Sequence, residues 1–438
     1  MFQIKSPSQE TGYCRGMFLF HPDPGLSPRV PSPPLSDASI ETEVTAEAGI
    51  TPGAGQTLRV TPLVDEGAIL AQGAPVACLQ QAPDVHFVAP MAGLVARLSM
   101  RPGRKLSEIV LFREALGDVV RHETAPAGTE AGLRRLMQRA GVWPCIQRRP
   151  FGGMPTPGER PAAIMVMAAD TRPLAPVPRL ALAHREEALD RGIAALTQLT
   201  DGPVLLCAEA GAPLISPKPG GRVQLVTCGG RHPQGSGGIR IHQTFPATHG
   251  APVWEIHAED VASLGDLLAT GILPQSRLVS ITGGALRQAR LVHTQPGADL
   301  RELTQQHLRP GQHRLLSGSA IDGHRSHWLA PRARQVTALT ERPAPAPRHW
   351  LLQALTRSAG PGPVIPTAAL DQAFGGALPA VPFVRALSAG DTETATRMGL
   401  LSLLEDDVAM ADYVLGGEAG LASLLRGMLD DIQREVAA

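Results

Sequence analysis

Two apolar runs lie near the middle of the chain: Val204-Leu205-Leu206-Cys207 and Val223-Gln224-Leu225-Val226-Thr227-Cys228. A third run, Leu278-Val279-Ser280-Ile281, follows an amphipathic segment that begins at about Val261 and is ended by Gly271. Short β-branched runs that alternate with helices and glycine turns are typical of a parallel sheet covered by crossover helices. We therefore expect residues 204–283 to form an α/β layer around which the rest of the chain is organised.

Length and charge limit the classes of protein to which the chain can belong. With 438 residues it is too long for one ordinary core, so we expect two to four domains. The 40 basic and 40 acidic residues balance, which argues against a nucleic-acid or anionic-lipid surface. No apolar run approaches the roughly 18 residues that span a bilayer, and the first residues lack the order of a signal peptide. We expect any membrane contact to be made through partner proteins.

Cysteine and histidine spacing gives no metal or iron–sulfur motif. The five cysteines are Cys14, Cys78, Cys145, Cys207 and Cys228. None belongs to a Cys-x-x-Cys pair, so we expect no local zinc or iron–sulfur site. The pair His324 and His327 has no third ligand nearby in sequence, and we predict neither a metal site nor catalytic residues.

The block before the central layer alternates apolar strands with glycine turns over residues 64–76 and 85–95. This pattern resembles the hammerhead fold of biotinyl and lipoyl carrier domains, in which a hairpin displays a lysine for the cofactor. Here the connecting segment is Gln80-Gln81-Ala82-Pro83-Asp84, and Lys105 lies well beyond it. We therefore expect the fold without a swinging cofactor arm.

Helix and strand signals divide the rest of the chain. We expect a helix from Thr129 to near Gly141, a strand at 164–167, and a helix near 182–199 that leads into the strand at Val204. A strand, turn and helix at 291–303 and a returning strand at 314–319 predict a small β-grasp-like unit.

After the stiff linker Ala344-Pro345-Ala346-Pro347, Asp391 is expected to cap a helix that carries Met398, Leu401 and Leu404, and a final helix begins near Leu421. The predicted fold is α/β multidomain. Its parts are an irregular N-terminal segment (1–40), a hammerhead domain (41–125), a central α/β domain (126–285), a β-grasp-like, SLBB-type domain (286–340), and a linker with a helical C-terminal domain (341–438).

Several local sequences occur in the order found in one known family: Gly141-Val142-Trp143 through Arg149-Pro150-Phe151, Ala169-Asp170-Thr171-Arg172-Pro173-Leu174, His232-Pro233-Gln234-Gly235, residues 278–290, Leu315 with Ser317-Gly318-Ser319, and residues 387–393. Together with the order of domains, they resemble the NqrA family of the sodium-translocating NADH:quinone reductase over roughly residues 60 to 435. The family's lysine-glycine-leucine opening is replaced here by Ile4-Lys5-Ser6-Pro7. The resemblance also implies a central layer like that of the flavin-binding subunit of respiratory complex I.

The resemblance identifies a first group of candidate ligand residues. In the flavin-binding relatives a glycine-rich loop approaches the flavin phosphate, because glycine has no Cβ to prevent the contact. The matching stretch is Arg148-Arg149-Pro150-Phe151-Gly152-Gly153, in which Pro150 has no N–H and Phe151 is bulky. We therefore expect no bound flavin. Arg148, Arg149 and Phe151 are better suited to the amphipathic ring of a quinone.

A second group of candidates follows the predicted strands. Relatives place carboxylates that meet the nicotinamide nucleotide at the position of Asp170; the other interpretation is that Asp170 caps a turn and pairs with Arg172. His232 offers both a donor and an acceptor to a phosphate or a quinone, although the glycines after it could simply allow a tight excursion between strands. The complete set of candidate quinone-binding residues is Arg148, Arg149, Phe151, Gly152, Gly153, Asp170, His232 and Gly235.

The resemblance implies a peripheral subunit of a membrane-bound, Na⁺-translocating NADH:ubiquinone oxidoreductase, on the cytoplasmic face of the bacterial inner membrane. We expect it to bind no flavin or iron–sulfur centre, to contribute to ubiquinone binding or reduction and to assembly with the other subunits, and not to be catalytic alone. NADH would be the substrate of the whole complex. Two alternatives stay open: a self-sufficient soluble NADH-binding flavoprotein, and a divergent paralogue that acts as a scaffold outside any respiratory complex.

Overall fold

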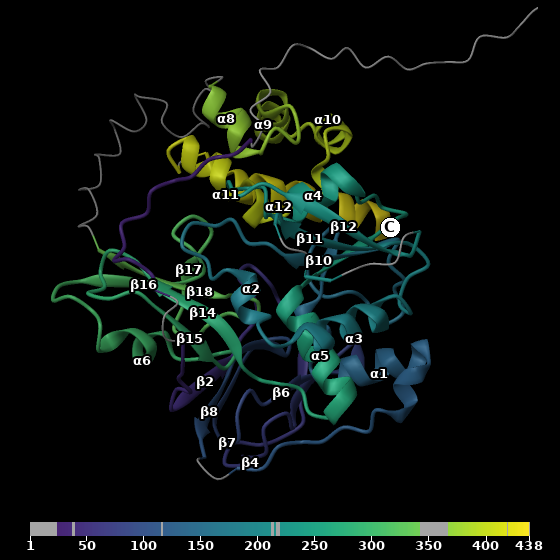
Figure 1. Cartoon of the computed structure of the whole chain (residues 1–438), viewed down its shortest axis with the longest axis vertical. Coiled ribbons are helices and arrows are strands. Elements are labelled where there is room, and N and C mark those ends of the chain that lie inside the picture. The colour runs from purple at the N-terminus through teal and green to yellow at the C-terminus, as the bar shows by residue number, and fades with distance from the viewer. Residues whose placement is uncertain are drawn as a thin grey trace, which may run out of the picture.

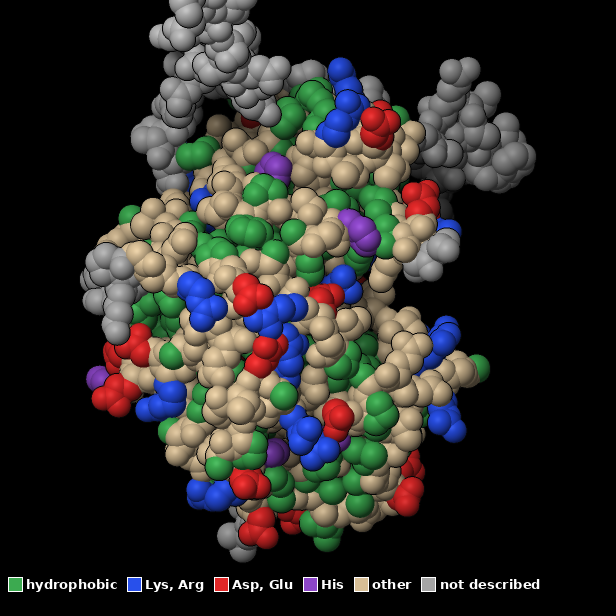
Figure 2. All heavy atoms as spheres, turned by 90° about the vertical axis from the view of Figure 1, so that its right-hand side faces the viewer, with side chains coloured by type: hydrophobic (Ala, Val, Ile, Leu, Met, Phe, Trp, Pro, Cys, Tyr) green, Lys and Arg blue, Asp and Glu red, His purple; other side chains and the backbone are tan. Residues whose placement is uncertain are grey.

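The computed structural model describes residues 24–36, 40–114, 117–211, 214–215, 220–341, 367–417 and 419–437. Most of the expected N-terminal segment, Cys14 and the linker at 344–347 lie outside the described residues. Figure 1 shows an antiparallel β domain at the bottom, a central α/β layer, a second large sheet at the left, and the C-terminal helices at the top. Figure 2 shows basic and acidic side chains interspersed over one face, as expected from the balanced composition.

The N-terminal β domain consists of two antiparallel sheets. The first sheet has the order β2 (Glu47–Ile50), β8 (Lys105–Arg113), β7 (Gly93–Arg101) and β4 (Ile69–Leu70), and the second has β3 (Val60–Pro62), β5 (Pro75–Leu79) and β6 (Ala82–Val88). Val76, Ile109 and Leu111 are fully buried between them. Alternation of buried and exposed positions along these strands is typical of antiparallel sheets with one covered face.

The central sheet has the order β12 (Val223–Cys228), β11 (Val204–Glu209), β10 (Ala163–Ala168), β13 (Val253–His257) and β9 (Gln147–Arg149). The first four strands are parallel, and β9 is antiparallel to β13. The strands predicted at 164–167, 204–207 and 223–228 are confirmed, whereas β13 and β9 were not predicted. Cys207 and Cys228 are buried among the apolar side chains of one face of this sheet.

Helices cover both faces of the central sheet. The side chains of α1 (Glu130–Arg139), α3 (Glu186–Leu196) and α5 (Ala258–Thr270) share one core with one face, and α4 (Gly237–Thr244) packs on the other. Thr129 caps α1, as predicted, and the short α2 (Pro178–Ala181) precedes α3. Helix α5 begins earlier than expected because His257 caps it, and it ends at Gly271, whose φ of 75° is left-handed.

The second large sheet corrects the prediction for Leu278–Ile281. Its order is β1 (Glu41–Thr42), β15 (Arg290–Thr294), β14 (Arg277–Thr282), β18 (Gln335–Thr340), β16 (His313–Ser317) and β17 (His324–Arg325). The expected third strand of the parallel layer is β14, which pairs with β15 and β18 instead. A fully buried strand has the same apolar pattern in either sheet, so periodicity does not identify its neighbours. The predicted strand, helix and strand are confirmed as β15, α6 (Leu300–Gln305) and β16.

The C-terminal helices are α8 (Ala368–Ala373), α9 (Ala380–Ala389), α10 (Thr392–Arg397), α11 (Glu405–Val414) and α12 (Leu421–Ala437). The side chain of Asp391 caps α10 by accepting from the Thr394 N–H, as predicted. The expected continuation through Leu401 and Leu404 is wrong, because α10 ends at Arg397 and Gly399 turns the chain with a φ of 108°. Among the described residues, the helices are all too short or too polar to cross a membrane.

Candidate functional site

A cavity of about 1320 Å³ lies where all four parts of the chain meet. Its walls come from the loop 49–58 between β2 and β3, the carboxyl ends of β10 and β13, the loop between β17 and β18, and the helices α11 and α12. Ligands of open α/β sheets bind at the carboxyl ends of the parallel strands. Its position and size make this cavity the candidate ligand site.

The cavity lining includes six of the eight residues that the sequence selected: Phe151, Gly152, Gly153, Asp170, His232 and Gly235. The side chain of Arg149 is only 1% exposed, and its two terminal nitrogens lie 2.8 Å from Glu255 Oε2 and 3.0 Å from Asp407 Oδ2. Arg148 pairs with Glu159 at 3.1 Å. Neither guanidinium is placed where a ligand contact was predicted, and both instead join parts of the protein to one another.

The turn after β9 brings the C-terminal helices against the central sheet. Phe151 has a left-handed φ of 80°, and its carbonyl oxygen accepts a hydrogen bond from Arg426 Nη1 at 2.8 Å. Gly152 has a φ of 75°, and a Cβ there would lie 3.2 Å from both Arg426 and Leu404. Glycine therefore permits both the backbone conformation and the close approach of α12.

Asp170 pairs with Arg172, as one of the two interpretations predicted. Its carboxylate accepts from the Arg172 backbone N–H at 3.1 Å and from Arg172 Nε at 2.9 Å. Arg172 also reaches Asp322 Oδ2 at 3.1 Å, in the loop between β16 and β17. Burial opposes the charge of Asp322, but this ion pair and hydrogen bonds from Ser319 hold the pKa of Asp322 below its usual value. Arg172 thus links the two large sheets at the edge of the cavity.

His232 and Gly235 form a tight contact with the turn after β10. His232 is 5% exposed, and its Nδ1 lies 3.3 Å from Thr171 Oγ1. Burial lowers the pKa of His232 to about 4, so its ring is neutral at neutral pH. The Gly235 N–H donates to Thr171 Oγ1 at 2.8 Å, and a Cβ at Gly235 would lie 2.7 Å from the Thr171 nitrogen. These contacts favour the interpretation that the glycine allows a tight excursion between strands.

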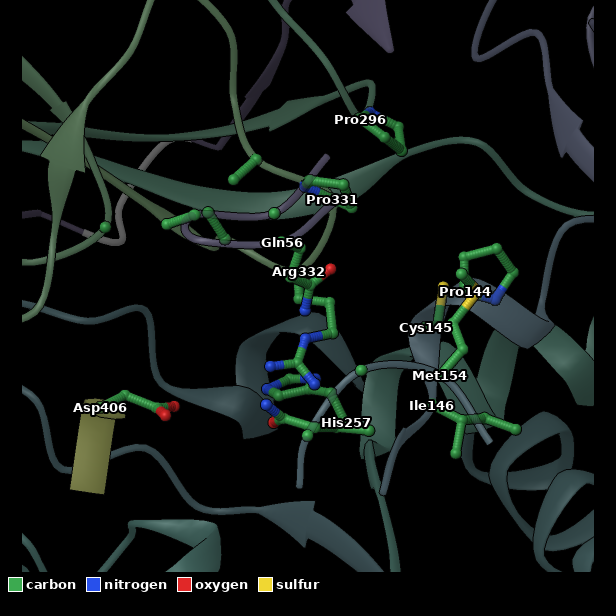
Figure 3. Close-up of a pocket in the computed structure, with 18 of the residues that line it drawn as sticks. Gln56, Pro144, Cys145, Ile146, Met154, His257, Pro296, Pro331, Arg332 and Asp406 are labelled. Atoms are coloured by element: carbon green, nitrogen blue, oxygen red, sulfur yellow. The ribbon is translucent and has the colours of Figure 1, made fainter. Parts of the chain in front are cut away.

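The sequence interpretation missed Arg332 and His257. Figure 3 shows Arg332 pointing into the cavity, with Asp406 on one side and Pro144, Cys145, Ile146 and Met154 on the other. Nothing in sequence distinguishes Arg332 from other surface arginines. His257 had a detectable signal, because it follows the apolar run Val253-Trp254-Glu255-Ile256 and precedes the acidic pair Glu259-Asp260, which is typical of a helix start.

The polar groups of the described residues include no cluster of three or more His, Cys, Asp or Glu side chains that could hold a metal ion. In the same part of the chain, Cys145 is deeply enclosed, and burial raises the pKa of its thiol to about 12. It therefore stays protonated and acts as a small apolar group in the cavity wall.

Two family models match the chain: the "NqrA second alpha/beta domain" over residues 129–273 and the "NQRA C-terminal domain" over residues 278–327. The NqrA subunit of the Na(+)-translocating NADH-quinone reductase of Serratia proteamaculans is 31% identical over 413 residues, which cover 86% of this chain and 91% of that protein. The corresponding protein of Alcanivorax borkumensis is 29% identical over 411 residues, with the same coverage of both chains. A solved NAD⁺-reducing [NiFe]-hydrogenase in the air-oxidized state gives a TM-score of 0.37 at 12% identity over 70% of this chain and 64% of that chain, a likeness too low to establish a shared fold. The similarity to the curated relatives shows that this chain belongs to the NqrA family of the Na⁺-translocating NADH-quinone reductase.

Proposed function

We propose that the chain is a peripheral, cofactor-free subunit of a bacterial Na⁺-translocating NADH:ubiquinone oxidoreductase, on the cytoplasmic face of the inner membrane. The observation that carries this proposal is the similarity over 86% of the chain to proteins named as the NqrA component of that reductase. In this function the assembled complex oxidises NADH. The chain contributes to quinone binding or reduction and to assembly with the other subunits, and it is not catalytic alone.

The composition of the cavity supports a role in binding quinone. Pro144, Ile146 and Met154 supply an apolar wall, and Arg332 and His257 supply polar groups. Binding sites for small organic molecules combine a mostly apolar lining with a few convergent polar groups. The ring of a quinone has this character, since it is apolar over its faces and carries carbonyl oxygens at its ends.

The turn after β9 supports the proposal that the chain binds no flavin there. Pro150 has no N–H to donate to a phosphate, and Arg149 is already engaged by Glu255 and Asp407. The backbone of Gly152 packs against Leu404 and Arg426. A flavin phosphate at this turn would have to displace the C-terminal helices.

The proposal can be tested in membranes from cells that carry the whole reductase. Deletion of this subunit should abolish Na⁺-stimulated reduction of ubiquinone by NADH, and the full chain supplied in trans should restore it. The purified chain should be colourless and should not oxidise NADH alone. Unchanged Na⁺-stimulated activity after deletion would favour the scaffold paralogue, and a yellow chain that oxidises NADH unaided would favour the soluble flavoprotein.

A further inference from the structure

Arg332 differs from the other arginines that line the cavity. Arg172, Arg277, Arg334 and Arg426 each have a carboxylate within 4.0 Å. Within the described part of the chain, the guanidinium of Arg332 has neither an ion pair nor a hydrogen-bonded side-chain partner, although burial lowers its pKa below the usual value. A guanidinium carries five N–H donors and no acceptor. Its donors therefore point into the cavity and are available to a ligand.

The backbone on both sides of the Arg332 side chain is held by buried cations. The Pro331 carbonyl oxygen accepts from Arg277 Nη1, and the Arg332 carbonyl oxygen accepts from Arg334 Nη1 at 3.4 Å. Arg334 is 3% exposed and pairs with Glu259 and with Asp260 at 2.9 Å each. The position of Arg332 is thus fixed by a network anchored on the first turn of α5. A binding group that is fixed in advance loses little entropy when a ligand arrives.

His257 supplies a second donor to the same space. Its Nδ1 accepts the Glu259 N–H at 3.2 Å in capping α5. Burial, with Arg334 and other nearby guanidinium groups, lowers the pKa of His257 well below the usual 6.5. A neutral ring whose Nδ1 accepts carries its proton on Nε2. Figure 3 shows the His257 ring beside Arg332 in the cavity, so the two side chains present donors only.

The wall across from Arg332 is apolar. Figure 3 shows Pro144, Cys145, Ile146 and Met154 on that side. Two of them suit a flat ring: methionine makes favourable contacts with aromatic rings through its sulfur, and the Cys145 thiol stays protonated. The cavity therefore combines donors at one end with a surface for a ring beside them.

We infer that Arg332 and His257 are the specificity-determining residues of this cavity, and that they bind the oxidised ring of a quinone through its carbonyl oxygen in preference to the hydroquinone. The inference rests on the proposed function and assigns the residues that select the redox form. A quinone carbonyl only accepts hydrogen bonds, which matches a pair of donors. A hydroquinone brings its own O–H, and a site built from donors leaves such a group unpaired.

The test uses the purified full chain and a soluble short-chain ubiquinone analogue, titrated in its oxidised and reduced forms by tryptophan fluorescence. Wild type should bind the oxidised form several-fold more tightly. Arg332→Gln should weaken binding of the oxidised form by roughly tenfold, which is the loss of one charge-assisted hydrogen bond. Because glutamine can also accept, the preference between the two forms should fall toward one. The control is Arg314→Gln, an exposed arginine on β16 of the same sheet, which should leave both affinities unchanged.

Each other outcome has a distinct meaning. If wild type binds the analogue and Arg332→Gln binds both forms as wild type does, the inference is wrong while the proposed function stands. If wild type binds neither form, the quinone role of the cavity is wrong and the inference fails with it. If benzoate displaces the analogue and binds more tightly in an Arg332-dependent way, the donors select a carboxylate and not a quinone. The substitution breaks no side-chain hydrogen bond to any described residue, so the melting temperature of Arg332→Gln should match that of wild type.

Discussion

His232 is buried against Thr171 and, with a pKa of about 4, is neutral in the folded protein. In the unfolded chain a histidine has a pKa near 6.5. Between these values the unfolded chain binds a proton that the folded chain does not. The free energy of unfolding should therefore fall as the pH drops from 6.5 toward 4, by about 1.4 kcal/mol per pH unit from this residue.

Replacing His232 with Asn removes the titration and keeps an acceptor near Thr171. In urea titrations between pH 6.5 and pH 5, wild type should lose about 2 kcal/mol more than His232→Asn. His327→Asn, at an exposed position, is the control and should behave as wild type does. Parallel losses in wild type and His232→Asn would show that the ring of His232 is charged in the folded state.

Residue roles could be predicted from sequence only where the partner lies nearby in the chain. The pairing of Asp170 with Arg172 is of this kind, because the two residues are separated by one position. The roles of Arg149 and Arg332 are not. Each stands beside a proline in sequence, yet carboxylates from distant elements, those of Glu255 and Asp407, neutralise Arg149, whereas Arg332 has no ion pair among the described residues.

At the scale of elements, α3 and α5 touch through reciprocal glycines. A Cβ at Gly265 of α5 would collide with the carbonyl oxygen of Ala188 on α3, and a Cβ at Gly192 of α3 would collide with the carbonyl oxygen of Val261 on α5. Arg191 Nη1 also donates to the Gly265 carbonyl oxygen at 3.0 Å. The two helices can approach this closely only because both positions lack a side chain.

Gly265→Ala should therefore destabilise the protein by about 1–3 kcal/mol, because the added methyl group overpacks the contact between the helices. Gly427→Ala is the matched control in α12, where a Cβ meets nothing within 4 Å. It should be neutral or stabilising by about 0.5–1 kcal/mol. Chemical denaturation of both variants checks the difference, and equal effects would contradict the close-contact explanation.

Elements with a strong local signal were predictable. Thr129 and Gly271 fixed the start of α1 and the end of α5. The strand β13 was missed because it alternates apolar residues with Glu255 and His257, and its neighbour β9 is a three-residue strand rich in charge. Pairing partners also lay beyond local signals, as the position of β14 shows. Both family models agree with that position, since one ends at residue 273 and the other begins at 278.

At the scale of the whole molecule, buried ion pairs join the two large sheets. Arg334, just before β18, pairs with Glu259 and Asp260 in the first turn of α5. Glu259 also accepts the Leu278 N–H at 2.8 Å, at the start of β14. Removing one member of such a group leaves buried charges without a partner, which costs far more than the loss of an exposed pair.

Arg334→Met should lower the free energy of unfolding by about 3–5 kcal/mol and bring early hydrogen exchange to residues 277–340. The control Arg325→Met breaks the exposed pair with Glu341 and should cost less than about 1 kcal/mol. Calorimetry and hydrogen exchange of both variants give the comparison. A stable Arg334→Met protein would show that the sheets are held together without this network.

The place of β18 has a consequence for protein synthesis. It lies between β14 and β16, yet it follows both in the chain. A ribosome releases the chain from its N-terminus onward, so β14 and β16 emerge while the strand that separates them is still being translated. Until residue 340 is available, both strands have an open edge that can pair with another chain. The nascent polypeptide is therefore exposed to aggregation over this interval, and slow translation of residues 318–340 would prolong the exposure.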